Sequence, residues 1–294
     1  MIATVINYCT NDYRFLDLCL AEVRKFSREI IVPVCDHFFD GKLENRLLLE
    51  HSYAAHPDVR FVEFAFGEES YGLYSGLKEG DPDWIHYWHS TARYVGYQFV
   101  SPAIEYVLFL DIDEVADGEK MKAWLNEFPY RNFDAVRFTN YFYFREARFQ
   151  ATKIMRNGLL VKKEKLEPEL LLDVNERKGT FYNLAGERLE GAPALDGTPL
   201  FHHYSWVKTK AEMQKKVVSW GHHLDKDWPT LIEEEFKEPF QFKDKFWGFE
   251  YTEVVPYVDP LEVQIPTTQI INPYPNVTKV NKKLLQRMRI EAEL

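Results

Sequence analysis

The sequence contains few cysteines and no long apolar run. Cys9, Cys19 and Cys35 lie in apolar stretches, and none belongs to a Cys-x-x-Cys pair. This spacing argues against a disulfide framework and a zinc cluster, and it favours reduced thiols in a core. No window of about eighteen residues is uninterruptedly apolar, and the N-terminus opens into an apolar stretch without the basic segment of a signal peptide. We therefore expect a cytoplasmic protein.

Positive charge is also scarce. The chain has 36 Lys and Arg against 46 Asp and Glu, a net charge of -10. Nucleic-acid-binding proteins neutralise phosphates with basic surfaces, so we expect no nucleic-acid partner. Aromatic residues are abundant at 16%, within a hydrophobic share of 46% that is enough to fill the core of a large α/β domain. Aromatic rings beside polar groups suit both packing and the faces of sugars.

Strands and helices alternate through the first third of the chain. β-branched and apolar runs predict strands at 2–6, 29–34, 59–66 and 106–110. Helical periodicity predicts helices at 42–55 and at 85–99, and an earlier helix for which Asn11 or Asp12 is the expected N-cap. This alternation predicts an α/β fold with a mostly parallel sheet covered by helices on both sides. Such sheets bind their ligands at the carboxyl ends of the strands.

The pattern changes after residue 134. An aromatic, extended run at 135–144 predicts a long strand, and the Asn157-Gly158 dipeptide between apolar segments predicts a hairpin turn. A last amphipathic helix is expected at 210–224. The Pro-rich stretch 256–275 predicts irregular chain that wraps the surface.

The triplet Asp111-Ile112-Asp113 follows five apolar residues and precedes a helix expected to start near Gly118. In extended chain, carboxylates two residues apart project to the same side. That arrangement suits a hard divalent cation that shares its ligand shell with substrate phosphates. Two neighbouring acids are costly to bury without a cation or hydrogen-bond donors. An ordinary helix-capping turn is the alternative interpretation.

The same residues also fit the first motif of haloacid-dehalogenase-type phosphatases. In that chemistry Asp111 would be a covalent phosphate acceptor, and a downstream lysine with a pair of acids near a Gly-Asp would be needed. No convincing Gly-Asp pattern follows Asp113, and the motif normally opens its domain. A non-catalytic protein that binds a sugar or a nucleotide is the third hypothesis.

Three motifs together resemble GT-A glycosyltransferases over residues 2–225, and in particular the family-two-like and bisecting N-acetylglucosaminyltransferase-type enzymes. They are the run from Asp111 to Val115, the run Tyr141-Phe142-Tyr143-Phe144, and the run His203-Tyr204-Ser205-Trp206. The resemblance implies a Rossmann-like nucleotide-binding half at 1–117 and an acceptor-side half with a mixed sheet at 118–225. Residues 226–294 would be an extension that wraps this domain.

The resemblance also implies a cofactor and substrates. Asp111 and Asp113 would bind Mn²⁺ or Mg²⁺ across the two phosphates of a nucleotide-diphosphate sugar, a UDP-sugar by family likeness. His203 would complete the metal shell, with His202 as the alternative. The acceptor would be a hydroxyl of a glycan or of a lipid-linked molecule. The donor-binding candidates, each of which can also be an ordinary structural residue, are Asn7, Thr10, Asp36, Arg93, Asp111, Lys216 and His222.

Inverting sugar transfer needs a carboxylate base that deprotonates the acceptor hydroxyl. Asp173 closes an apolar run, Asp196 precedes the histidine-bearing strand, and Glu146 follows the aromatic strand. These three are the candidates, and a retaining mechanism without a dedicated base stays open. The basic tail Lys279–Arg289 is interpreted either as a peripheral membrane contact or as a packed terminal helix.

Overall fold

The computed structural model describes residues 1–38, 40–65, 81, 83–219, 221–270 and 274–280. Nearly all of the basic tail lies outside these residues. In the described part of the chain, no helix has the length and apolar composition needed to cross a membrane.

The first half of the fold is a parallel sheet, as predicted. Its strands run in the spatial order β4-β1-β2-β3-β12, and each neighbouring pair is parallel. Their bounds are β1 (Ile2–Asn7), β2 (Glu29–Cys35), β3 (Arg60–Phe64), β4 (Tyr106–Asp111) and β12 (Val277–Val280). All six residues of β1 are buried, which agrees with a strand covered on both faces.

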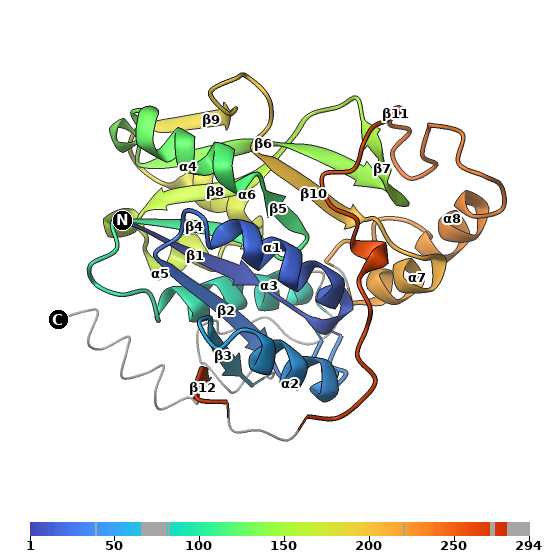
Figure 1. Ribbon diagram of the computed structural model, residues 1–294, viewed down its shortest axis with the longest axis horizontal. Helices are drawn as coiled ribbons and strands as arrows, with labels where there is room; N and C mark the ends of the chain where they lie inside the picture. The colour runs from blue at the N-terminus through green and yellow to red at the C-terminus, as the bar shows by residue number, and fades with distance from the viewer. Residues whose placement is uncertain (39, 66–80, 82, 220, 271–273, 281–294) are drawn as a thin grey trace.

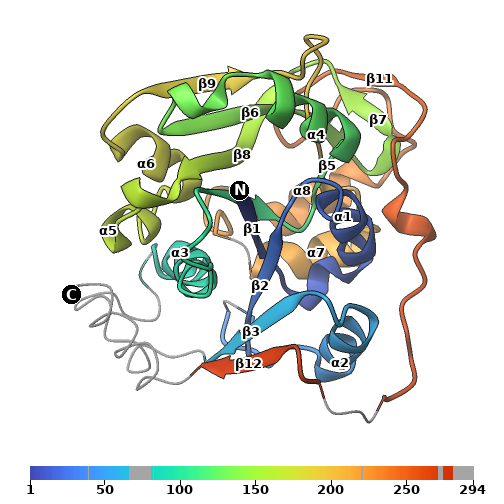
Figure 2. The same ribbon diagram turned by 60° about the vertical axis from the view of Figure 1, so that its left-hand side comes forward.

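Helices cover both faces of this sheet, with α1 and α2 on one side and α3 on the other (Figures 1 and 2). They span α1 (Leu16–Val23), α2 (Arg46–Ala55) and α3 (Trp84–Tyr97). Alternate residues of β1 enter two separate cores: Ile6 packs in the core that contains α1 and α2, and Val5 packs in the core that contains α3.

The second half continues the sheet with mixed pairing, which confirms the predicted α/β class with a mixed second part. From β4 the order is β8-β6-β7-β11, all antiparallel, while β9 and β10 pair with β6 in parallel and β5 pairs with β10. The strands are β5 (Glu114–Ala116), β6 (Ala135–Phe144), β7 (Glu146–Ala151), β8 (Met155–Lys162), β9 (Arg188–Ala192), β10 (Phe201–Trp206) and β11 (Tyr251–Glu253).

The helices of the second half start at recognisable capping residues. Helix α4 begins at Gly118, where it was expected, because the side chain of Asp117 accepts a hydrogen bond from the backbone N–H of Lys120. Thr209 and Glu212 form a capping box at the start of α7, which ends at Val218, earlier than predicted. The second-half helices are α4 (Gly118–Glu127), α5 (Pro168–Leu171), α6 (Glu176–Asn183), α7 (Lys210–Val218) and α8 (Trp228–Glu235).

Two local predictions are wrong. Asn157 and Gly158 do not form a turn but lie inside β8, because the following apolar residues of that strand pair with β4 and bury against it. Strands β7 and β8 are not partners of each other, since each pairs with β6. Neither Asn11 nor Asp12 caps α1, because a 3-10 turn (Thr10–Phe15) precedes that helix and Asp12 forms an ion pair with Lys208.

The chain after α8 reaches both ends of the sheet. It adds β11 beside β7, then passes along the molecule and adds β12 beside β3 (Figure 1). The side chain of Asn276 donates hydrogen bonds to the backbone carbonyls of Tyr53 and His56 just before β12. The two strands flank the stretch predicted to be irregular, whose described residues contain no regular element except the 3-10 turn Pro260–Glu262.

Candidate active site

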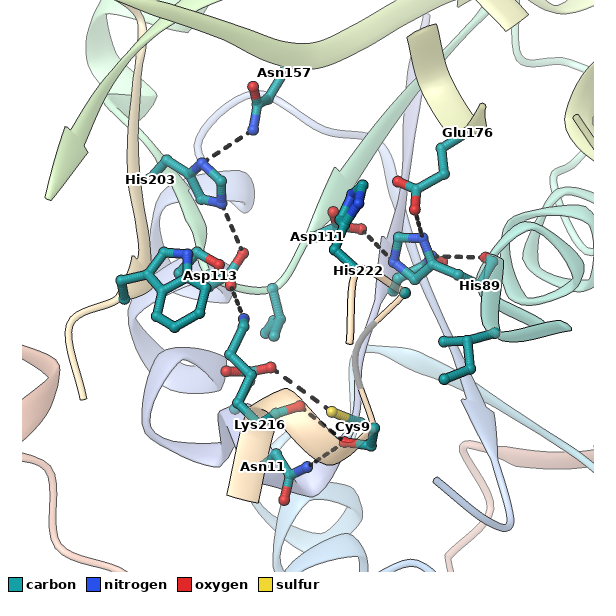
Figure 3. Close-up of a pocket in the computed structure, with 18 of the residues that line it drawn as sticks. Cys9, Asn11, His89, Asp111, Asp113, Asn157, Glu176, His203, Lys216 and His222 are labelled. Carbon is teal, nitrogen blue, oxygen red and sulfur yellow. Dashed lines mark hydrogen bonds and ion pairs between the residues drawn. The ribbon is translucent and has the colours of Figure 1, made fainter. Parts of the chain in front are cut away.

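A cavity of about 510 Å³ opens at the carboxyl ends of β1 and β4. Asn7 and Asp111, the last residues of these two strands, are paired in the sheet register and both line the cavity. The location agrees with the rule that α/β sheets bind ligands at this edge. Figure 3 shows how the labelled side chains around the cavity point toward one another.

Asp111 is held by two cationic side chains. Nη2 of Arg177 donates a hydrogen bond of 2.7 Å to Oδ2 of Asp111, and Nε2 of His89 lies 3.2 Å from Oδ1. Arg177 also pairs with the buried carboxylate of Glu114. Burial alone would raise the pKa of Asp111, but Arg177 and His89 hold it at about 2. Asp111 is therefore ionised at neutral pH.

Asp113 has a similar environment built from later parts of the chain. Nζ of Lys216 lies 3.4 Å from Oδ2 of Asp113, and Nε2 of His203 lies 3.5 Å from Oδ1 (Figure 3). Burial opposes ionisation, yet Lys216 and His203 lower the pKa of Asp113 well below its usual range. The two carboxylates of the triplet are thus both charged and both directed into the cavity.

The side chains at this site fit a divalent cation whose remaining ligands come from a bound substrate. Oδ1 of Asp111 and Oδ1 of Asp113 are buried and accept no hydrogen bond from the described residues. These two oxygens face the imidazoles of His89 and His203 instead. The described residues contain no group of three or more His, Cys, Asp or Glu side chains arranged to hold a metal by themselves. Mg²⁺ and Mn²⁺ commonly use one or two carboxylates together with substrate phosphates, so Asp111, Asp113 and His203 fit the protein's share of such a site.

The two adjacent histidines face opposite sides of β10. His203 lines the cavity, whereas His202 points away from it and shares a hydrogen bond of 2.7 Å between its Nδ1 and Oη of Tyr143. The ring of His202 stacks on Tyr257 with centroids 4.3 Å apart, and burial lowers its pKa to about 3. Of the two candidates, only His203 is placed to bind a metal in this cavity.

A row of contacting histidine and carboxylate side chains along the cavity wall was not predicted from the sequence. Oε1 of Glu176 lies 3.2 Å from Nδ1 of His89 and 3.1 Å from Nδ1 of His86. Burial opposes the charge on His89, but Glu176 and Asp111 raise its pKa to about 9, so the ring is cationic at neutral pH. Glu176 also has a positive φ of 57°, a strained conformation that is frequent near functional sites.

The spacing of the histidines in the sequence could have indicated this row of side chains. His86, His89 and Arg93 are spaced three and four residues apart, so they share one face of α3. Glu176 had no such signal, because it comes from a different helix and is brought to this face only by the fold.

Of the predicted donor-binding residues, four line the cavity: Asn7, Asp111, Lys216 and His222. The other three do not. Thr10 is bound to the buried carboxylate of Glu44, and Asp36 lies beside His37 outside the cavity. Arg93 is 1% exposed and lies behind the wall, 3.9 Å from Glu176, where it supports the wall.

None of the three predicted bases lines the cavity. Asp173 accepts hydrogen bonds from the side chains of Asn175 and Asn183, which fixes the start of α6. Asp196 forms an ion pair with Lys120 in a turn. Glu146 forms an exposed pair with Arg148. Each of the three carboxylates contacts a local partner instead of the cavity.

Part of the cavity lining is aromatic. Its rings belong to Phe142, Trp206, Trp228, Trp247 and Phe249. Trp206 and Trp228 are each 2% exposed and form the support, whereas Trp247 and Phe249 are only partly buried. The rings of Trp247 and Phe249 are stacked with centroids 5.9 Å apart. The aromatic part begins beside the charged part, since the centroid of the Trp206 ring lies 6.0 Å from Nζ of Lys216 and that of the Phe142 ring lies 5.6 Å from that of His203. The cavity therefore combines charged groups at the sheet edge with an adjoining aromatic wall.

No protein-family model and no curated protein matches the sequence. Several solved structures show a distant likeness. Staphylococcus aureus TarS 1-349 is 13% identical, with 80% of this chain and 72% of that chain covered and a TM-score of 0.39. The glycosyltransferase GlyE of Streptococcus pneumoniae TIGR4 is 13% identical, with 80% and 63% covered and a TM-score of 0.38.

The mannosyltransferase PcManGT of Pyrobaculum calidifontis, solved with GDP-Man and Mn²⁺, is 10% identical. The match covers 67% of this chain and 55% of that chain, with a TM-score of 0.40. At such low identities and scores the function has to be argued from the residues of the cavity itself.

Proposed function

We propose that this chain is a metal-dependent glycosyltransferase that transfers a sugar from a nucleotide-diphosphate donor to a hydroxyl acceptor. The observation that carries this proposal is the pair of ionised, buried carboxylates Asp111 and Asp113. Their Oδ1 atoms accept no hydrogen bond from the described residues and face the imidazoles of His89 and His203. Both carboxylates lie at the carboxyl edge of a parallel sheet, next to His203 and Lys216. This combination suits a diphosphate bound through a divalent cation.

The charged part of the cavity would take the diphosphate. A Mn²⁺ or Mg²⁺ ion held by Asp111, Asp113 and His203 would supply positive charge that stabilises the departing nucleoside diphosphate. Lys216 lies beside Asp113 and would add a further cation for the phosphates. Arg177 fixes the carboxylate of Asp111 from the opposite side through a hydrogen bond of 2.7 Å. The nucleoside would lie along Asn7 and its neighbours in the cavity wall.

The aromatic wall would take the acceptor. Trp247 and Phe249 present partly exposed rings, which pack well against the C–H faces of a glycan. Lys226 and His222 also line the cavity and can hydrogen-bond acceptor hydroxyls. A glycan, free or lipid-linked, is accordingly the proposed acceptor class.

For an inverting course, we propose Asp225 as the base. It lines the cavity, and its carboxylate is 59% exposed, with Nδ1 of His222 at 3.0 Å. Glu176 also lines the cavity but is occupied by two histidines, and Asp12 is occupied by Lys208. Asp225 is thus the lining carboxylate best placed to reach an acceptor hydroxyl from the open side.

A thermal-shift panel tests the function. UDP, GDP, CDP and dTDP and their common sugars are added with and without Mn²⁺ to the wild type and to Asp113→Ala. We expect one nucleotide series to raise Tm only when Mn²⁺ is present, and we expect the variant to lose that response. A UDP response, strongest for UDP-N-acetylglucosamine, would support the finer likeness to the bisecting-type enzymes.

Two other outcomes would replace the proposal. A phosphoenzyme on Asp111 without nucleotide binding would favour the phosphatase hypothesis. Nucleotide binding without donor hydrolysis or transfer to any saccharide would favour a non-catalytic binding protein.

A further inference from the structure

Asn157 lies behind His203, on the side of the ring that faces away from Asp113. Its side-chain amide nitrogen is 3.0 Å from Nδ1 of His203, and Nε2 of the same ring is 3.5 Å from Oδ1 of Asp113. Figure 3 shows the three side chains in one line that continues to Lys216. One imidazole therefore connects an amide to the carboxylate of the candidate metal site.

The sheet holds this line in place. Asn157 belongs to β8 and His203 to β10, and both strands pair with the long strand β6 between them. Asp113 follows β4, which pairs with β8 on its other edge. The spacing of the three side chains is thus fixed by neighbouring strands rather than by flexible loops.

The local sequence does not explain Asn157. Asparagine and glycine are both depleted in strands, yet Asn157-Gly158 begins the buried part of β8, directly before Leu159 and Leu160. Residues that break a local preference without a packing benefit are frequently retained for a functional reason. The hydrogen-bonding contact with His203 supplies that reason.

The tautomer of His203 decides what its Nε2 can do. A neutral imidazole binds a metal through Nε2 only when its proton is on Nδ1, and a partner that accepts this proton selects that tautomer. An amide can serve, because a half turn about its terminal torsion exchanges the oxygen and the nitrogen in nearly the same positions.

We propose that Asn157 is a positioning residue whose side-chain oxygen accepts the Nδ1 proton of His203, and so keeps Nε2 open toward Asp113 and a divalent cation. The proposal rests on the proposed function for the identity of the cation. The tautomer itself is a property of the protein alone and can be measured separately. Asn157 acts through His203 and has no contact with the sugar in this role.

Two substitutions of similar size distinguish whether Asn157 accepts a hydrogen bond from Nδ1 of His203 or donates one to it. Asn157→Leu removes all hydrogen bonding, whereas Asn157→Asp can only accept from Nδ1. Calorimetric titration with MnCl₂ alone should show affinity about 10- to 100-fold weaker for Asn157→Leu and at least as strong as wild type for Asn157→Asp. If the amide instead donates to Nδ1, the proton is on Nε2 and Asn157→Leu will bind Mn²⁺ more tightly, which would overturn the proposal.

A His203→Ala background provides the matched control. There the effect of Asn157→Leu on Mn²⁺ affinity should vanish, because the partner through which it acts is absent. Any gain from Asn157→Asp that persists in this background reports the added charge alone. An Asn157→Leu effect that stays undiminished there would mean that the residue acts on folding and not on His203.

Nitrogen-15 NMR of the His203 ring, without metal and above the titration range of the ring, gives an independent answer. We expect the Nδ1–H tautomer in the wild type and in Asn157→Asp, and a loss of this preference in Asn157→Leu. An Nε2–H tautomer in the wild type would refute the proposal, whatever the nucleotide assays show. Conversely, failure of every nucleotide to bind would remove the proposed function and leave this result standing.

Discussion

Nζ of Lys216 lies 3.4 Å from Oδ2 of Asp113, and both side chains are largely buried. Breaking a buried ion pair by removing one partner leaves an uncompensated charge and costs about 3–5 kcal/mol. Lys216→Met should therefore lower Tm in the absence of metal. Because Asp113 would then lack a competing cation, Mn²⁺ should raise Tm by more in the variant than in the wild type.

Lys215→Met is the matched control, since Lys215 is the neighbouring residue of α7 and is exposed. It should change neither Tm nor the response to Mn²⁺. Calorimetric unfolding with and without Mn²⁺ makes the comparison. A Lys216→Met protein that is destabilised but no longer responds to Mn²⁺ would argue against a cation between the carboxylates.

Asp225→Asn should abolish most of the transfer without affecting donor binding. A general base contributes about 10²- to 10⁴-fold to the rate, so the turnover number should fall within that range. The metal-dependent Tm shift with the nucleotide should persist, because Asp225 is not part of the carboxylate pair. Glu146→Gln, an exposed carboxylate outside the cavity, should leave both quantities unchanged. A variant with wild-type turnover would point to a retaining course or to another base.

Trp247→Ala should weaken acceptor use and leave donor hydrolysis intact. Loss of ring packing worth about 1–1.5 kcal/mol corresponds to roughly a tenfold higher KM for a saccharide acceptor. Trp247→Phe keeps a flat ring and should recover most of the affinity. Initial rates against a saccharide panel, with hydrolysis of the donor measured in parallel, separate the two parts of the cavity. An equal loss of hydrolysis would place Trp247 on the donor side.

Glu44 makes stability depend on pH. Its carboxyl is 8% exposed, and burial raises its pKa from 4.5 to about 7 despite hydrogen bonds from Thr10 and Asn45. A pKa that is higher in the folded state gives a contribution that is fully present below the unfolded value and is lost as pH rises through 7. This loss amounts to about 3 kcal/mol.

Glu44→Gln should remove that dependence. Its free energy of unfolding, measured in urea, should decrease less between pH 4.5 and pH 8 than that of the wild type. Glu50→Gln is a control on the same side of the molecule, because Glu50 pairs with the half-exposed Arg46 and is not enclosed in this way. Parallel pH profiles for wild type and Glu44→Gln would contradict the assignment.

Predictions from the sequence were correct where they rested on hydrophobic periodicity or on the residues at the end of a strand. Apolar runs of β-branched residues fixed the positions of β1, β2 and β4, and the two carboxylates after β4 were found at the predicted edge. Burial on both faces of a parallel sheet imposes this pattern directly on neighbouring residues. The alternation of side chains along β10 likewise limits a metal ligand to one of its two adjacent histidines.

The Asn157-Gly158 dipeptide shows where such reasoning fails. A dipeptide that favours turns became part of a buried strand, because pairing with β4 and β6 outweighed the local preference. The bases predicted from their positions next to expected strands and apolar runs lie outside the cavity for a related reason. Each carboxylate binds a donor or cation nearby, as Asp173 accepts a hydrogen bond from Asn183.

By itself, the sequence determined the α/β class, the strand that ends in the acidic triplet and the faces of the main helices, since these depend on residues close together in the chain. Only the tertiary structure decided which distant groups meet Asp111 and Asp113. Arg177, Lys216 and His203 follow the triplet by many residues and come from three different elements. Their charges act over a few ångströms of space, a distance that separation along the chain does not specify.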